Sequence, residues 1–495
     1  MSERHQIDVT RIEAERTPSA IGIVHLGLGA FHRAHQAQVV AQCIEAGETD
    51  WGITSANLRS GRALVETLRR GDCRYHLAEY RDSRCVTLRD VRAIREAFFT
   101  GVDAQGRPGE DLEALLSRMA DPATRIVTLT VTEKGYYLNP ADGRLRLEDP
   151  AVAFDLENPE TPHTAPGILC EALARRRAAG LAPFTVLCCD NMPENGVRTR
   201  QAVLGMAVRR DASLSQWIEA EVAFPSSMVD RIVPAMNEDA FARLSALGLD
   251  DPAAVISERF LQWVIEEHFP QGRPGWEIAG VEMVEDVTPF ETMKLRMLNG
   301  AHSLLAYVGP LLGHETVARA VADPDMQRLL VRYMLKEAAP TLEMPTGVDL
   351  AAYADALLKR FANDSLHHRL SQIAMDGSQK LPQRWLEGAQ KRLETAEATP
   401  DAIAATAFGL AAWIIHTGGV DGAGHTWQIN DPMADRLAEC HDHHAASPAA
   451  LAAAVLGIRE IFPASLGDDP RFTRSVNEAL EAIERDGARV ALSFL

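Results

Sequence analysis

The fold is decided by the stretch IGIVHLGLG at residues 21–29, an apolar run that ends directly at two glycines. The run is short and bounded by a turn, as in a buried strand, and a helical segment follows at residues 34–47. Gly27 and Gly29 would let the backbone approach a pyrophosphate at the N-terminus of that helix. The segment therefore predicts the start of a dinucleotide-binding unit. An ordinary tight turn is the alternative, since His32 stands where a third glycine is usual.

Strand-like and helical segments alternate through the first half of the chain, which predicts an α/β fold with a Rossmann-type parallel sheet. After about residue 286, long Ala- and Leu-rich helical stretches follow one another and strand signals nearly vanish. We predict a dinucleotide-binding domain at residues 1–285 and a mainly α-helical substrate and catalytic domain at residues 286–495. The strand-like segments after the first are residues 51–58, 124–132 and 183–191, and the helical ones are residues 60–71, 109–120 and 166–180.

The charge balance restricts the partners. The chain has 50 Lys and Arg against 69 Asp and Glu, a net charge of −19, and it lacks a long basic block. We therefore expect a small-molecule ligand, and neither nucleic acid nor an anionic membrane surface. The longest uncharged apolar run, residues 402–415, is shorter than the roughly 20 residues that span a bilayer. The charged N-terminus lacks the apolar core of a signal peptide, so we expect a cytoplasmic protein.

Metal binding is not indicated by the cysteines and histidines. The seven cysteines include no CxxC pair, which argues against both a disulfide framework and a zinc site. Cys188 and Cys189 lie in an apolar run, where buried free thiols are expected. The stretch CHDHH at residues 440–444 lacks the spacing of a zinc site and is predicted to be a polar surface loop between helices.

A second informative stretch, KLRMLNGAH at residues 294–302, lies in a helix-like run from residue 289 to residue 312. At about 100° per residue, Lys294, His302 and Asn299 fall at roughly 0°, 80° and 140° around an α-helix. One helix can therefore present an amine, an imidazole and an amide to one site. Carbonyl reduction needs such a set, because a proton donor serves the alcohol oxygen and neutral donors polarise the carbonyl. The alternative is a partly exposed helix whose polar residues face water.

Further polar residues follow the predicted strands, where ligands of open parallel sheets bind. Thr132 and Glu133 follow one strand, and Asn191 follows the next. We expect Asn191 to face the site and Asn195 to cap the following helix. Arg33, in the turn after the first strand, is a candidate to pair with a phosphate.

Taken together, these segments resemble the mannitol dehydrogenase family of long-chain polyol dehydrogenases, from about residue 22 to the C-terminus. The family signature K-x4-N-x2-H is intact as Lys294, Asn299 and His302. Within the family, the segment IAMDGSQKLPQR at residues 373–384 resembles the fructuronate reductase branch. The resemblance implies a metal-independent oxidoreductase that uses NAD(H) and interconverts fructuronate with mannonate. The alternatives are a mannitol- or arabinitol-type polyol 2-dehydrogenase, a non-redox epimerase with bound NAD, and an inactive binding module.

The resemblance also implies residue roles. Lys294 would be the general acid and base, Asn191 and Asn299 would donate hydrogen bonds to the oxyanion, and His302 would orient the substrate. Contacts to the cofactor are expected from Gly27, Leu28, Gly29, Ala30, Phe31, Arg33, Thr132, Glu133 and Asn191. Contacts to the substrate are expected from Asp230, Arg231, Lys294, Asn299, His302 and Lys380.

One departure concerns the choice of cofactor. Relatives commonly carry an Asp in the loop after the second strand, and here Ser60-Gly-Arg replaces it. Arg59 and Arg62 in this loop are candidates to pair with a 2′-phosphate, so that NADP stays open beside the expected NAD.

Overall fold

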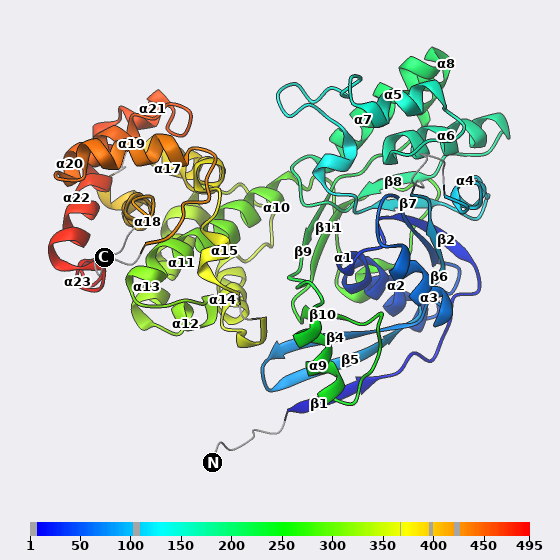
Figure 1. Cartoon of the computed structure of the whole chain (residues 1–495), viewed down its shortest axis with the longest axis horizontal. Helices are drawn as coiled ribbons and strands as arrows, with labels where there is room; N and C mark the ends of the chain where they lie inside the picture. The colour runs from blue at the N-terminus through cyan, green and yellow to red at the C-terminus, as the bar shows by residue number, and fades with distance from the viewer. Residues whose placement is uncertain (1–6, 102–108, 367, 396–398, 420–425) are drawn as a thin grey trace. The chain divides into compact units, whose positions relative to one another are not determined.

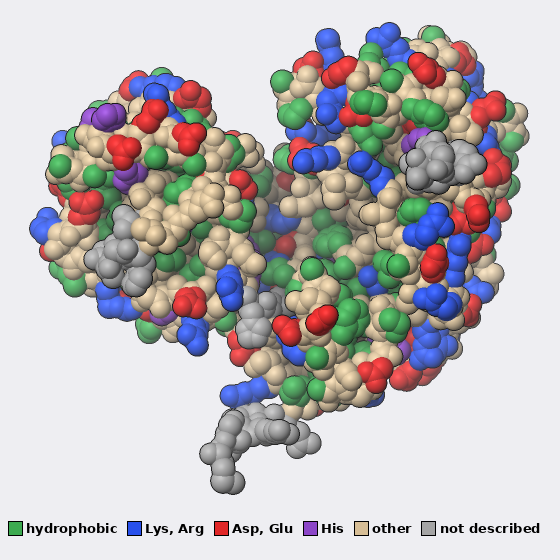
Figure 2. Space-filling view, in the orientation of Figure 1, with side chains coloured by type: hydrophobic (Ala, Val, Ile, Leu, Met, Phe, Trp, Pro, Cys, Tyr) green, Lys and Arg blue, Asp and Glu red, His purple; other side chains and the backbone are tan. Residues whose placement is uncertain are grey.

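The computed structural model describes residues 7–101, 109–366, 368–395, 399–419 and 426–495 (Figure 1). The chain divides into two compact units, Met1–Thr288 and Pro289–Leu495, and each is described by itself. On the face shown in Figure 2, acidic and basic side chains are interspersed over the surface of each unit. No helix of the described residues is both long enough and apolar enough to cross a membrane.

The first unit is built on a five-stranded sheet of order β6-β3-β2-β7-β8, in which every neighbouring pair is parallel. The predicted α/β class with a Rossmann-type parallel sheet is confirmed. The strands are β2 (Ile21–Leu26), β3 (Gly52–Asn57), β6 (Ile94–Phe99), β7 (Ile126–Leu129) and β8 (Thr185–Cys188).

Helices cover both faces of this sheet, so successive residues of β2 point into two different cores. Ile23 packs in one core with Val40 of α2, whereas Val24 packs in a second core with Ile168 of α6. A strand buried on both faces needs the continuous apolar run that the sequence shows. The helices of the unit are α1 (Ala30–Ala34), α2 (Gln36–Glu45), α3 (Arg62–Arg70), α4 (Leu112–Met119), α5 (Pro150–Glu157), α6 (Ala165–Ala178), α7 (Asn195–Arg210), α8 (Ala212–Glu221) and α9 (Glu238–Ala246), with short 3₁₀ turns η1 (Glu133–Tyr136) and η2 (Trp276–Ala279).

Two further sheets in this unit are not indicated by the sequence pattern. The larger has the order β1-β5-β4-β10, and its β4–β5 pair is an antiparallel hairpin; the smaller has the order β12-β11-β9. Their strands are short or carry many polar residues, so local periodicity did not mark them. The strands are β1 (Asp8–Ile12), β4 (Tyr75–Asp82), β5 (Cys85–Val91), β10 (Val255–Glu258), β9 (Ser227–Asp230), β11 (Gln262–Glu266) and β12 (Glu282–Val284).

The second unit is helical in the residues described. Its core contains α11 (Gly300–Leu311) and α18 (Ala404–His416), both almost wholly buried, with α22 (Pro470–Asp486) packed against α18. Three π-helical segments interrupt the α-helices: η3 (Lys294–Asn299), η4 (Tyr333–Ala338) and η7 (Pro382–Leu386). The remaining elements are α10 (Thr288–Met293), α12 (Val317–Val321), α13 (Pro324–Arg332), η5 (Ala339–Thr341), α14 (Leu350–Phe361), η6 (Asp364–Leu366), α15 (Leu370–Ile373), α16 (Gly377–Leu381), α17 (Glu387–Leu393), η8 (Pro400–Ile403), α19 (Ala434–His444), α20 (Pro448–Leu456), α21 (Ala464–Gly467) and α23 (Ala488–Leu492).

The prediction of a polar loop at residues 440–444 was wrong, because these residues end α19. Leu437 and Cys440, three residues apart, form the buried side of this helix. His441 also points inward, where its Nε2 hydrogen-bonds with the hydroxyl of Thr417 at 3.0 Å. Cys188 and Cys189 are buried free thiols, as predicted.

Candidate active site

The glycine turn after β2 has the geometry of a nucleotide-binding loop. Gly27 has a φ of +115°, and a Cβ atom there would lie 2.1 Å from the carbonyl oxygen of Thr130. Only glycine meets both conditions. At Gly29 a Cβ atom would meet only the carbonyl oxygen of Gly27, at 3.8 Å, so the outer surface of the turn is open. Such a turn leaves room for the backbone to approach a phosphate closely.

A pair of buried imidazoles supports this turn from below. His25 and His32 stack with their ring centroids 3.4 Å apart. His25 hydrogen-bonds with the hydroxyls of Thr128 at 2.7 Å and Thr130 at 2.9 Å. Burial lowers the pKa of His25 to about 3, so this ring is neutral near neutral pH. In the described part of the chain, no cluster of three or more His, Cys, Asp or Glu side chains is placed to hold a metal ion.

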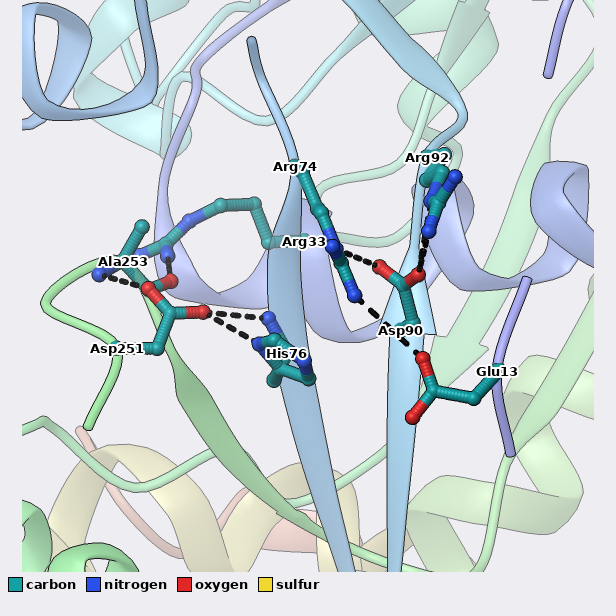
Figure 3. A network of polar contacts seen from close by, with 8 residues as sticks. All are labelled: Glu13, Arg33, Arg74, His76, Asp90, Arg92, Asp251 and Ala253. Carbon is teal, nitrogen blue, oxygen red and sulfur yellow. Dashed lines mark hydrogen bonds and ion pairs between the residues drawn. The ribbon is translucent and has the colours of Figure 1, made fainter. Parts of the chain in front are cut away.

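Arg33 was expected to pair with a phosphate, but its contacts favour a structural role instead. Arg33 is 5% exposed, and its guanidinium donates hydrogen bonds to the carbonyl oxygens of Gly29 and Ala253. Figure 3 shows the side chain directed at Ala253, beside the ion pair of Asp251 with His76. The cation therefore holds the α1 turn to the segment before β10. The Leu28 side chain is likewise buried in the core, which leaves only its backbone for a ligand.

The ends of β7 and β8 are joined by Asp190. Its carboxylate accepts hydrogen bonds from the backbone N–H of Val131 at 3.0 Å and of Thr132 at 2.9 Å, and from the hydroxyl of Tyr136 at 2.6 Å. Thr132 has φ 66° and ψ 159°, a region almost reserved for glycine. The three hydrogen bonds hold this costly conformation. Nothing in the sequence pattern indicates that Asp190 joins these two strand ends, although it stands beside Asn191, which was predicted to face the site.

Asn191 and Glu133 are both exposed at this edge of the sheet, in reach of a ligand. The prediction that Asn195 caps the next helix was wrong. Asn195 is the first residue of α7, and its buried amide donates to the carbonyl oxygens of Asp190 at 3.0 Å and Ser227 at 2.7 Å. It therefore ties the end of β8 to β9.

Asp230 and Arg231 were expected to contact the substrate. Asp230 ends β9 and is 7% exposed. The side chain of Arg231 is fully buried and pairs with Glu79 at 2.5 Å, and it also donates to the backbone oxygens of Ala34 and Glu258. These partners use the guanidinium within the first unit, so its contacts favour a structural role for Arg231.

In the second unit, the segment that carries Lys294 and Asn299 is π-helical, which corrects the angles predicted for an α-helix. Hydrogen bonds in a π-helix run between residues five apart, so residues with that spacing lie near one face. Lys294 and Asn299 have this spacing and are brought together, whereas an α-helix would separate them by about 140°. Short π-helical segments occur often at functional sites.

Side chains from the other two π-helical segments stabilise this geometry. The Tyr333 hydroxyl donates a hydrogen bond of 2.7 Å to the carbonyl oxygen of Arg296, and Trp385 Nε1 donates one of 3.1 Å to that of Gly300. Arg384 donates to the carbonyl oxygen of Asn299 at 3.4 Å and to the Ser303 hydroxyl at 2.9 Å. The carbonyl groups that a π-helical turn displaces therefore have partners.

His302 lies one helical turn further on, against aromatic rings. Its ring centroid is 4.8 Å from that of Phe361 and 5.8 Å from that of His368. Burial lowers the pKa of His302 well below its usual value, and Arg360, His368, Arg384 and Lys294 lower it further. The imidazole is therefore neutral. Its Nε2 is buried and has no hydrogen-bond partner in the described residues.

Lys294 is 7% exposed, so the residue is largely buried. Lys380, on α16, donates a hydrogen bond of 2.6 Å to the carbonyl oxygen of Met375 and lies 3.9 Å from the carboxylate of Asp376. Burial and nearby Arg384 lower the pKa of Lys380. This unit thus gathers several cations close to the residues of the K-x4-N-x2-H signature.

Comparison with known proteins identifies the family. Residues 21–278 match the mannitol dehydrogenase Rossmann domain, and residues 286–484 match the mannitol dehydrogenase C-terminal domain. The chain belongs to the mannitol dehydrogenase family. The family prediction made from these segments of the sequence together, the Lys, Asn and His signature among them, is confirmed, and the protein is an oxidoreductase of this family.

Several members are similar over nearly their full length. D-mannonate oxidoreductase of Escherichia coli is 44% identical over 96% of this chain and 95% of its own. A D-sorbitol dehydrogenase in substrate-free form is 34% identical, with a TM-score of 0.88 over 98% of this chain and 97% of its own. Pseudomonas fluorescens mannitol 2-dehydrogenase, in a ternary complex with NAD and D-mannitol, is 34% identical, with a TM-score of 0.75 over 98% and 96%.

Proposed function

We propose that this protein transfers hydride between a nicotinamide dinucleotide and the carbonyl carbon of a keto sugar acid, with fructuronate and mannonate as the pair. The positive charge around His302 carries this proposal. The positive charges of Lys294, Arg360 and Arg384 each lower the pKa of this ring. A site of this charge suits an anionic substrate better than a neutral polyol.

Arg384 supports the same substrate class. Its described partners are neutral, a backbone carbonyl and the hydroxyl of Ser303, and burial lowers its pKa. A partly buried guanidinium that lacks a carboxylate partner favours a carboxylate ligand. The positive charge of Arg384 lowers the pKa of Lys380, which places the two cations near each other. Lys380 is therefore the second candidate to bind the substrate carboxylate.

The proposed proton transfer uses Lys294. Its ammonium donates a proton to the oxygen that becomes the alcohol during reduction, and its amine accepts that proton during oxidation. Asn299, five residues on in the π-helical segment, and Asn191 donate hydrogen bonds to the same oxygen as negative charge develops on it. His302, neutral and with its Nε2 unpaired in the described residues, hydrogen-bonds with a substrate hydroxyl.

The dinucleotide, when bound, supplies or accepts the hydride. The open turn at Gly27 and Gly29, with the backbone of residues 28–31, fits the pyrophosphate. Thr132, Glu133 and Asn191, at the ends of β7 and β8, are the proposed contacts to the rest of the cofactor. The solved mannitol 2-dehydrogenase complex contains NAD, which supports a nicotinamide cofactor here.

A paired assay tests the substrate class. We expect the parent to reduce fructuronate with a kcat/KM at least about a hundredfold above that for fructose, because fructose has no carboxylate to pair with Arg384. Lys380→Met should lower this ratio by about tenfold or more. Lys359→Met is the matched control, because that side chain is 76% exposed and pairs with Asp355.

A parent that prefers fructose, or mannitol in the reverse direction, would refute the sugar-acid assignment and favour a polyol 2-dehydrogenase. Epimerised product without net nicotinamide turnover would instead indicate a non-redox epimerase. Failure to bind any nicotinamide nucleotide would indicate an inactive binding module. Each result leaves membership of the family unchanged.

A further inference from the structure

A pocket of about 430 Å³ lies in the first unit at the carboxyl end of the five-stranded sheet. Its walls are the segments that follow β3 and β7 and the residues that precede α6, and Gly27 lines its inner end. Since β3 and β7 flank β2 in the sheet, the pocket extends to both sides of the glycine turn. In a βαβ dinucleotide fold this region receives the adenosine end of the cofactor.

The charge of this pocket is one-sided. Arg59 lines it from the segment after β3, and Lys134 lines it from the segment after β7. Neither side chain has a hydrogen bond or ion pair within the described residues, and both are exposed. None of the described residues that line the pocket is acidic. Two other titratable residues line the pocket. Burial raises the pKa of Tyr137 and lowers that of His163, which stacks on Phe154 at 4.1 Å, so neither adds a charge near neutral pH.

The position of Arg59 decides which cofactor this charge favours. The strand β3 is the second strand of the βαβ unit, where a carboxylate that accepts hydrogen bonds from the ribose hydroxyls selects NAD. Here that place is taken by Arg59 and Ser60, and both line the pocket. A guanidinium can pair with a phosphate through two parallel hydrogen bonds, and a hydroxyl can donate one more.

We propose that this pocket binds the 2′-phosphate of NADP(H), and that the protein uses NADP(H) in preference to NAD(H). Arg59 and Ser60 are the specificity-determining contacts, and Lys134 adds a second cation from the β7 side. The inference rests on the proposed nicotinamide-dependent function and names the cofactor of that same site.

Arg62 is separated from this role by its contact with Phe99. Its guanidinium carbon lies 4.5 Å from the centre of that ring, and the side chain does not line the pocket. A cation over an aromatic face is held in place by the ring. Arg62 is therefore a matched control, since it removes the same charge from the same loop.

Nucleotide binding to the full chain, measured in the absence of substrate, tests the proposal independently of turnover. Adenosine 2′,5′-bisphosphate and adenosine 5′-monophosphate differ only in the 2′-phosphate, and their affinities are measured by titration calorimetry. We expect the bisphosphate to bind at least about tenfold more tightly at low salt. Arg59→Gln should remove most of this ratio, Lys134→Met part of it, and Arg62→Gln little.

Ser60→Asp should reverse the preference, because a carboxylate repels the 2′-phosphate and accepts hydrogen bonds from the ribose hydroxyls. The same order is expected for kcat/KM with NADPH and NADH. The ratio for the parent should fall as salt rises, since Arg59 and Lys134 are exposed.

Equal or tighter binding of the monophosphate by the parent would overturn the inference and leave the oxidoreductase proposal standing. The inference would also be overturned by an Arg59→Gln variant that weakens the binding of both nucleotides equally, or by an Arg62→Gln variant that lowers the ratio of the two affinities as much as Arg59→Gln does. If neither nucleotide binds, the dinucleotide site itself is refuted, and the proposed function falls with it.

Discussion

Gly300→Ala should disable the site without touching the substrate. A Cβ atom at Gly300 would lie 2.0 Å from the hydroxyl oxygen of Tyr333 and 2.7 Å from its Cζ. Non-bonded carbon atoms pack at about 3.5–4.0 Å, so the phenol or η3 must move by about 1 Å or more. That movement breaks the hydrogen bond of Tyr333 to the carbonyl oxygen of Arg296, which holds the π-helical segment.

Two costs follow from this change. Overpacking is worth about 1–3 kcal/mol and the lost buried hydrogen bond about 1 kcal/mol, so the free energy of unfolding should fall by about 2–4 kcal/mol. A displacement of about 1 Å at Lys294 and Asn299 should reduce kcat by about a hundredfold. The affinity for the nucleotide should stay near that of the parent, because the proposed nucleotide contacts lie in the first unit.

Urea unfolding, steady-state kinetics and nucleotide titration measure the three effects. Tyr333→Phe is the companion variant, since it removes the hydroxyl that the new methyl group would meet. The double variant should lose less stability than the two single losses added together, because both act on one contact. A Gly300→Ala protein with the stability and kcat of the parent would refute the argued packing of η3. Additive losses of stability in the double variant would refute the proposed role of Tyr333.

Three other outcomes are expected. Lys294→Ala should reduce kcat by at least about a hundredfold while nucleotide binding is retained, and activity within tenfold of the parent would rule out its acid–base role. Asn191→Ala and Asn299→Ala should each lower kcat more than they raise KM, since oxyanion donors act mainly in the transition state; an effect on KM alone would assign them to ground-state binding. Hydrogen bonds from Arg489 keep the pKa of the Asp323 carboxyl below its usual value. Asp323 therefore stabilises the fold at neutral pH, and the stability difference from Asp323→Asn should shrink as the pH falls below about 4 in thermal unfolding. A difference that stays constant down to pH 3 would contradict this assignment.

Local pattern in the sequence was sufficient to predict the start of the dinucleotide-binding unit. The apolar run of β2 and the glycines after it predict a strand, a turn and a helix, because each depends on neighbouring residues. Gly27 shows the limit of such local rules, since its positive φ is a property of the turn but the close approach of Thr130 comes from the segment that follows β7. The spacing of Lys294, Asn299 and His302 placed these residues on one helical run, which the structure also shows.

The partners of polar side chains were decided only by the tertiary structure. Arg33, Arg59, Arg62 and Arg231 look alike in the sequence, yet two are buried against carbonyl oxygens, one lies over Phe99, and one lines a pocket. Each choice depends on residues far away in the chain, because a buried guanidinium takes whatever acceptor packing brings to it.

The π-helical turn at Lys294 was likewise determined partly by the sequence and partly by the tertiary structure. The sequence by itself determined that this segment is helical and that it carries an amine, an amide and an imidazole. It did not determine the winding, because α- and π-helical turns differ little in local preference. Tyr333 and Trp385, 37 and 85 residues from their acceptors, supply hydrogen bonds to the carbonyl groups of this segment. Long-range packing therefore decided that Lys294 and Asn299 share one face, since only the folded second unit brings these donors to η3 and its junction with α11.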